Sequence, residues 1–219
     1  MTGPLVSVLL PSRGRPASLI SSIRSLRTLA DGPATAVEIL VGCDPDDPLT
    51  ADTARMHAAT AVLFERRHGY HQLHLYCNAL AELANGAWLL LWNDDATMTT
   101  PRWDVVLAGF DATEPLVLNL ASTGYGHALC CFPAVSAALY RRLGHLSCSP
   151  HIDTWLQDIG RATGRIRDVE VHVRHDRHDL TGGHDDTTRA EALAGYRTEE
   201  FYGERMQALL RADIEKVRA

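Results

Sequence analysis

Positive charge is scarce in this sequence, and lysine is nearly absent. Its 219 residues include 21 Lys and Arg against 27 Asp and Glu, and the single lysine is Lys216. No cluster of basic residues stands out, so neither a nucleic-acid surface nor an anionic membrane surface is expected. A nucleotidyltransferase is also disfavoured, because no glycine-rich phosphate loop with a lysine follows the first apolar run.

Cysteines are few, and none form a C-x-x-C pair. The five are Cys43, Cys77, Cys130, Cys131 and Cys148. An odd count without paired spacing excludes a disulfide scaffold. The opening MTGPLVSVLL carries no basic residues before its apolar run, so no signal peptide is predicted and a cytoplasmic protein is expected.

The sequence also lacks an uninterrupted hydrophobic run long enough for an integral membrane segment. Residues 115–140 carry no charge, but glycines, Pro133 and polar residues interrupt them. We expect a buried strand, a turn and the start of a helix there, with Cys130 and Cys131 in a strand.

What the sequence does contain is an alternation of short apolar runs and helical patterns. Strands are predicted over residues 5–10, 37–41, 61–64, 88–92 and 169–173. Helices are predicted over residues 16–29, 50–60 and 74–83. This alternation predicts a single α/β domain, a mostly parallel sheet with helices on both faces.

Polar residues follow three of these strands directly. Ser12-Arg13-Gly14-Arg15 follows the first, Asp44 the second, and Asn93-Asp94-Asp95 the run WLLLW. In open α/β sheets, ligands bind at the carboxyl ends of the strands, where these side chains would converge. Adjacent carboxylates suit Mg²⁺ or Mn²⁺, and arginine forks suit phosphate. Simple turns and caps are the alternative interpretation.

These segments resemble the openings of family 2-type glycosyltransferases with the GT-A fold. The resemblance rests on VSVLLPSRGRPASLISSIRSL, EILVGCDPDD, GAWLLLWNDDATMTTPRWD and HIDTWLQDIGRATGR, and covers roughly residues 5–178. It implies a GT-A-like α/β fold and transfer of a sugar from a nucleoside-diphosphate sugar, most commonly UDP-linked, to an acceptor hydroxyl.

The resemblance also implies roles for particular residues. The expected nucleotide-sugar contacts are Pro11, Ser12, Arg13, Arg15, Asp44, Asn78, Asn93 and Asp94. Asp95 would bind Mn²⁺ or Mg²⁺. Asn93 departs from the family pattern, which has aspartate at that position.

Two further residues complete the expected site. Asp153 matches the general base of inverting members; a helix cap is the alternative, and Asp158 is a reserve base more typical of a solvated charge. His175 is the first choice for a histidine ligand to the cation, ahead of His178. Neighbouring His151 is either a surface residue or an aid to Asp153.

The resemblance divides the chain into a nucleotide-sugar-binding half (1–98), an acceptor half (99–188) and a C-terminal helical segment (189–219). The predicted helix over 193–217 would dock on the domain or on a second subunit, as in a homodimer. Two alternative functions stay open: a metal-dependent phosphohydrolase using the His-Asp pairs of the C-terminal segment, and a non-catalytic nucleotide-sugar binder.

Overall fold

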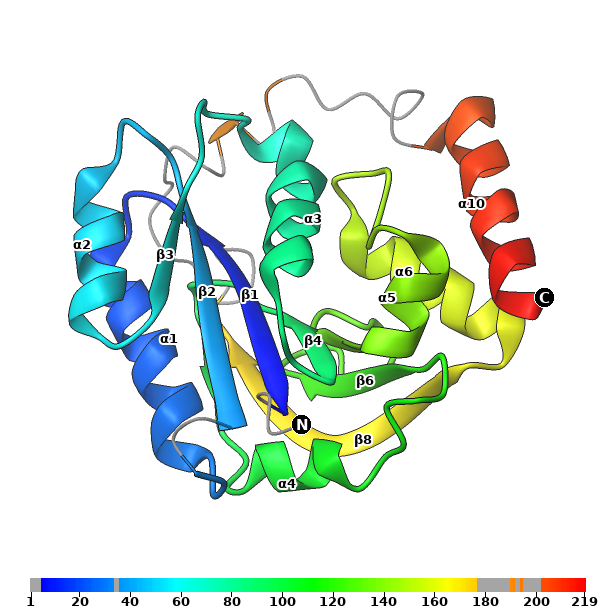
Figure 1. Cartoon of the computed structure of the whole chain (residues 1–219), viewed down its shortest axis with the longest axis horizontal. Helices are drawn as coiled ribbons and strands as arrows, with labels where there is room; N and C mark the ends of the chain where they lie inside the picture. The colour runs from blue at the N-terminus through cyan, green and yellow to red at the C-terminus, as the bar shows by residue number, and fades with distance from the viewer. Residues whose placement is uncertain (1–4, 34–35, 177–189, 192–193, 195–201) are drawn as a thin grey trace.

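One curved sheet forms the centre of the computed structural model, which describes residues 5–33, 36–176, 190–191, 194 and 202–219 (Figure 1). Its strands are β1 (Val6–Ser12), β2 (Val37–Cys43), β3 (Thr60–Leu63), β4 (Trp88–Leu91), β5 (Ala96–Met98), β6 (Val117–Ser122), β7 (Pro133–Ser136) and β8 (Ile166–His175). They lie in the order β3-β2-β1-β4-β7-β6-β8-β5.

The first four strands of this order are parallel, as the alternation predicts. Val8 of β1 pairs with Ile39 of β2 on one side and with Leu90 of β4 on the other. Beyond β4 the sheet becomes mixed, because β7 is antiparallel to both β4 and β6, while β6 and β8 are parallel and β5 is antiparallel to β8. The α/β architecture is therefore confirmed, with antiparallel pairing concentrated in the second half.

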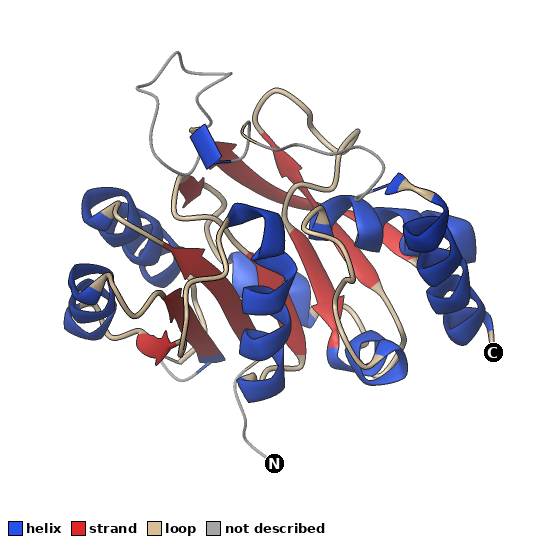
Figure 2. Ribbon diagram, turned by 90° about the horizontal axis from the view of Figure 1, so that it is seen from above, coloured by secondary structure: helices blue, strands red, loops and turns tan. Residues whose placement is uncertain are grey.

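Helices cover both faces of the sheet (Figure 2). They are α1 (Pro16–Leu29), α2 (Pro48–Met56), α3 (Leu73–Leu83), α4 (Trp103–Ala108), α5 (Ala137–Leu143), α6 (Ile152–Thr163) and α10 (Glu204–Arg218), with a 3₁₀ turn at Tyr70–Gln72. Side chains alternate along β1: Val8 and Leu10 belong to the core shared with α1, and Leu9 to the core shared with α3. A strand buried on both faces reads as a continuous apolar run, which explains LVSVLL.

The C-terminal helix packs on the domain itself. Figure 1 shows α10 at the right, beside α5 and α6, and Val217 is buried there with Leu210 and Ile214 packed around it. Docking on the domain is thus confirmed for residues 204–218, whereas residues 195–201 lie outside the described part of the chain. Among the described residues, no helix has the length and apolarity to cross a bilayer.

The prediction of a strand at Cys130–Cys131 is wrong. Both residues lie in the irregular segment between β6 and β7, where the backbone N–H of Cys130 donates to Gln157 Oε1 at 2.7 Å. Burial requires apolar side chains in an irregular segment as much as in a strand, so composition alone does not separate the two.

Candidate functional site

The carboxyl ends of β1, β2 and β4 converge, as the sequence predicts. Gly14 has a φ of +67°, a conformation that glycine adopts without strain. The arginines on its two sides bind different carboxylates: Arg13 Nη1 lies 3.0 Å from Asp44 Oδ2, and Arg15 Nη2 lies 2.9 Å from Asp94 Oδ1. The turn after β1 is thereby fixed to the ends of both neighbouring strands.

Asp44 is buried and holds two partners besides the backbone turn. Its Oδ2 faces Arg13, and its Oδ1 accepts a hydrogen bond from the Tyr76 hydroxyl. Burial and this bond raise the pKa of Tyr76 to about 12, so the phenol stays a donor. Arg67 lies 3.8 Å from the same carboxylate. Sequence reasoning missed both Tyr76 and Arg67; Tyr76 is detectable as a polar-tipped aromatic on the buried side of α3, but nothing in the sequence marks Arg67.

Asp94 and Asp95 are adjacent in sequence but differ in environment. The side chain of Asp94 is 1% exposed, and it accepts a hydrogen bond from Ser12 Oγ at 2.7 Å besides its contact with Arg15. The side chain of Asp95 is 25% exposed, with Oδ2 3.7 Å from Arg15 Nη1. Asp94 therefore anchors the turn after β1, whereas the partly exposed Asp95 turns its buried Oδ1 toward His175.

His175 reaches Asp95 because β8 pairs with β5. Ala96 is opposite His175 in the antiparallel register, and the backbone N–H of Asp176 donates to the carbonyl of Asp95 at 2.9 Å. His175 Nε2 then lies 3.2 Å from Asp95 Oδ1. Burial lowers the pKa of His175, but contacts with Asp95 and Cys131 outweigh it and leave the pKa raised.

The separation of these two ligand atoms fits an octahedral cation. Two neighbouring ligands of Mg²⁺, each about 2.1 Å from the ion, are about 3.0 Å apart, and the observed separation is 3.2 Å. Burial raises the pKa of Asp95, but His175 and Arg15 oppose that effect and leave it lowered, so the carboxylate is ionised. The pair therefore fits Mn²⁺ or Mg²⁺.

The other predicted donor contacts divide into two groups. Asn93 joins the site, with Nδ2 3.3 Å from His175 Nε2, and Pro11 lies in β1 opposite Gly42. Asn78 instead holds the loop before α6: its Nδ2 donates to the carbonyl of Ser147 at 2.9 Å, and its Oδ1 accepts from the N–H of Leu146 at 2.8 Å. Its side chain is thus engaged away from the strand ends. His178 lies outside the described residues.

Asp153 is in the first turn of α6 but is not its N-cap, which is His151. Asp153 Oδ1 accepts from the N–H of Thr154 at 2.8 Å, and burial raises the pKa of this carboxyl group. Its negative charge contributes to the raised pKa of Cys130, just as the neighbouring Cys131 contributes to that of His175.

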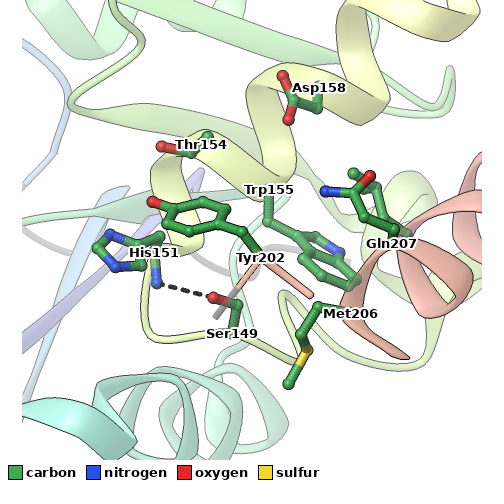
Figure 3. Close-up of a pocket in the computed structure, with 9 residues that line it drawn as sticks. Ser149, His151, Thr154, Trp155, Asp158, Tyr202, Met206 and Gln207 are labelled. Carbon is green, nitrogen blue, oxygen red and sulfur yellow. Dashed lines mark hydrogen bonds between the residues drawn. The ribbon is translucent and has the colours of Figure 1, made fainter. Parts of the chain in front are cut away.

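A hollow of about 290 Å³, including space open to solvent, lies between the start of α6 and the C-terminal segment (Figure 3). The His151 ring stacks on Tyr202 with centroids 5.2 Å apart, and its backbone N–H donates to Ser149 Oγ at 3.3 Å. Asp158 lines the same hollow, and burial raises its pKa. Asp158 is partly buried beside the α10 residues that line the same hollow, so its carboxylate is partly solvated.

No protein-family model and no curated protein sequence matches this chain. Solved structures do match its fold. The mannosyltransferase PcManGT from Pyrobaculum calidifontis, in complex with GDP-Man and Mn²⁺, has a TM-score of 0.60 at 14% identity, covering 99% of this chain and 88% of its own.

Two further solved structures also match the fold of this chain. S. aureus TarS 1–349 with UDP has a TM-score of 0.60 at 15% identity, covering 97% of this chain and 89% of its own. Glucosyl-3-phosphoglycerate synthase from Mycobacterium tuberculosis, with Mn²⁺, UDP and glucosyl-3-phosphoglycerate, has a TM-score of 0.63 at 16% identity, with coverages of 97% and 81%. The chain thus has the GT-A-type fold of these glycosyltransferases.

Proposed function

We propose that this protein is a metal-dependent glycosyltransferase, which moves a sugar from a nucleoside-diphosphate sugar to an acceptor hydroxyl. The observation that carries the proposal is the Asp95–His175 pair, an ion pair whose 3.2 Å separation is also compatible with two neighbouring ligands of an octahedral cation, beside Arg15 at the carboxyl edge of the sheet. The fold supports it, because PcManGT is in complex with a nucleotide sugar and Mn²⁺.

In this proposal each residue at the strand ends has a separate task. Asp95 and His175 would hold Mn²⁺ or Mg²⁺, which when bound offsets the charge of the diphosphate leaving group. Arg13 and Arg15 would contact phosphate oxygens through their guanidinium forks; Arg13 would do so by exchanging the exposed Asp46 carboxylate, which both of its terminal nitrogens contact, for phosphate. Asp44 retains lone pairs for the base, since a carboxylate accepts about four hydrogen bonds.

The remaining donor contacts follow the predicted assignment. The turn that Ser12 and Asp94 hold together would lie by the ribose, with Pro11 and Asn93 around the donor, and Asn78 would act on the donor site only through the loop that its side chain holds. UDP is the proposed nucleotide, although PcManGT with GDP-Man and TarS with UDP share the fold, so the base depends on local contacts.

Asp153 is the proposed general base of an inverting transfer. A carboxyl group whose pKa is raised by burial is a stronger base than a solvated aspartate, and it would take the proton of the acceptor hydroxyl. The donor site would then belong to residues 1–98 and the acceptor site to residues 99–188. Homodimerisation through the C-terminal segment stays a prediction.

The phosphohydrolase alternative is less well supported. In the one His-Asp pair of the described C-terminal residues, His175 turns to Asp95, and Asp176 lies 3.1 Å from Arg174. The two side chains therefore do not form a joint metal site.

The test is to incubate the protein with UDP-sugars and GDP-mannose in the presence of Mn²⁺ and a panel of hydroxyl-bearing acceptors that would receive the sugar, and to identify the nucleotide product. We expect release of nucleoside diphosphate by the wild type and by Asp52→Ala, an exposed carboxylate on α2, but not by Asp95→Ala. Release of nucleoside monophosphate or inorganic phosphate would contradict the transferase and support the hydrolase. Nucleotide binding without any release would support the non-catalytic binder.

A further inference from the structure

A second cluster of metal-binding side chains lies away from the strand ends. His145 and Cys148 are in the loop between α5 and α6, and Asp213 is on α10. Their ligand atoms all lie within 4.8 Å of one another. We propose that these three residues bind one zinc ion, which fastens α10 to the loop that leads into α6.

The distances fit a tetrahedral zinc site. With ordinary zinc bond lengths, a nitrogen and an oxygen ligand lie about 3.3 Å apart, and a nitrogen and a sulfur ligand about 3.5 Å apart. His145 Nε2 lies 3.4 Å from Asp213 Oδ2 and 3.8 Å from Cys148 Sγ. All three ligand atoms lie within 4.8 Å of one another, so the partly buried Cys148 would move toward His145 and Asp213 to close the site.

The surroundings hold the three ligands in place. The Asp213 side chain is 3% exposed; its Oδ2 accepts from Trp155 Nε1 at 3.1 Å, and its Oδ1 lies 2.9 Å from Lys216 Nζ. Such outer contacts orient a ligating carboxylate and are typical of metal sites. The loop is fixed in turn by Asn78, which binds the backbone of Ser147 between the other two ligands.

The charges of the ligands offset the charge of the ion. Zinc binds a thiolate and a neutral imidazole, so its two positive charges would be offset by Cys148 and Asp213, and the remaining positive charge of Lys216 lies on a side chain that is 46% exposed to solvent. Burial raises the pKa of Cys148, so the metal-free thiol is protonated; forming the zinc–sulfur bond releases that proton to solvent. Because His145 and Cys148 are both partly exposed, the ion can enter, and water would take the fourth position.

The ligand types separate this site from the one at the strand ends. Thiolate and imidazole suit zinc, whereas carboxylate oxygens suit Mn²⁺ and Mg²⁺. The zinc proposal therefore does not depend on the proposed transferase activity, and it can be tested without any sugar donor or acceptor.

The experiment measures metal binding by the chelator-treated full chain. Zn²⁺ is titrated against a chromophoric competitor in an Asp95→Ala/His175→Ala background, and Co²⁺ is added separately to record the thiolate-to-cobalt charge-transfer band. We expect one zinc per chain, a zinc-dependent rise in unfolding temperature, and a cobalt band. Cys148→Ser and His145→Ala should weaken zinc binding by about 100-fold or more, and Cys148→Ser should remove the band.

Controls keep the test specific. Asp213→Asn retains the hydrogen bond from Trp155 but should weaken zinc binding, while His57→Ala and Cys131→Ser should bind as the background protein does. Circular dichroism confirms that each variant folds. Absence of stoichiometric zinc, unchanged zinc affinity in Cys148→Ser, or loss of the cobalt band in Cys131→Ser would overturn the proposal.

Discussion

Replacing Asp153 with asparagine should abolish sugar transfer while making the protein more stable. Asparagine retains an oxygen that can accept the N–H of Thr154, the 2.8 Å bond seen in the structure, so the change removes the charge and keeps this contact. Loss of a general base typically lowers the rate by about 10²–10⁴-fold. Donor binding should be unaffected, because Asp153 lies in α6 and its hydrogen bond is with Thr154, not with a residue at the strand ends.

The stability change follows from the raised pKa of Asp153. Because burial lifts the folded-state pKa above the unfolded one, the stabilisation by this group is complete at pH values below the unfolded pKa and is lost as the pH rises through the folded pKa. At pH 7 the wild type has lost that contribution, and asparagine avoids the loss. Each unit of pKa shift is worth about 1.4 kcal/mol, and each kcal/mol about 2–4 °C in a domain of this size.

The assay pairs initial transfer rates with thermal unfolding at pH 7 and pH 4. The variant should unfold at a higher temperature at pH 7, with a smaller advantage at pH 4. The wild-type rate should fall on the acid side at a higher pH than an ordinary aspartate would give. Asp158→Asn is the matched control, since it removes a carboxylate with a raised pKa from the same helix and should retain transfer.

Three results would refute this reasoning. Transfer at the wild-type rate by Asp153→Asn would exclude it as the base, and loss of transfer in Asp158→Asn alone would assign that role to Asp158. A lower unfolding temperature at pH 7 would show that ionised Asp153 stabilises the fold, contrary to the cost of burying its charge.

Three other substitutions test the packing around the site. Asn78→Ala removes the hydrogen bonds to the Ser147 backbone and should cost about 1–3 kcal/mol in urea unfolding, whereas full stability would show that the loop holds without them. Asp94→Asn should destabilise by a similar amount, about 1–3 kcal/mol, and weaken donor binding, because its buried charge pairs with a partly exposed guanidinium; equal donor affinity would contradict the anchoring role. Gly86→Ala should lower the free energy of unfolding by about 1–3 kcal/mol, and with it the unfolding temperature, since the added Cβ would lie 2.4 Å from the Ser7 nitrogen. An unchanged unfolding temperature would show that the backbone moves to accommodate the added Cβ.

The donor side of the site could be predicted because its signals are local. Each of β1, β2 and β4 is an apolar run ending in polar residues, and parallel strands bring such ends to one edge. The contact between Asp95 and His175 could be predicted only from the family resemblance, because it depends on the pairing of β5 with β8.

Other features depend on contacts that sequence patterns do not encode. The apolar residues Cys130 and Cys131 predict a strand, but the structure has an irregular buried segment there. The antiparallel pairing of β7 has no signature in the local sequence. The partial burial of Asp158 depends on α10, whose residues line the hollow beside it. The zinc ligands escaped notice for the same reason, since Asp213 meets His145 only when α10 has docked.

Thermal unfolding of the wild type and of Asp95→Ala with a panel of nucleoside diphosphates, each with and without Mn²⁺, tests the central claim most directly. A ligand that binds only the folded state raises the unfolding temperature. The wild type should be stabilised by one nucleotide, and only with Mn²⁺, while Asp95→Ala should show no shift. Stabilisation of both proteins alike, or of neither by any nucleotide, would contradict a metal-dependent donor site at the carboxyl edge of the sheet.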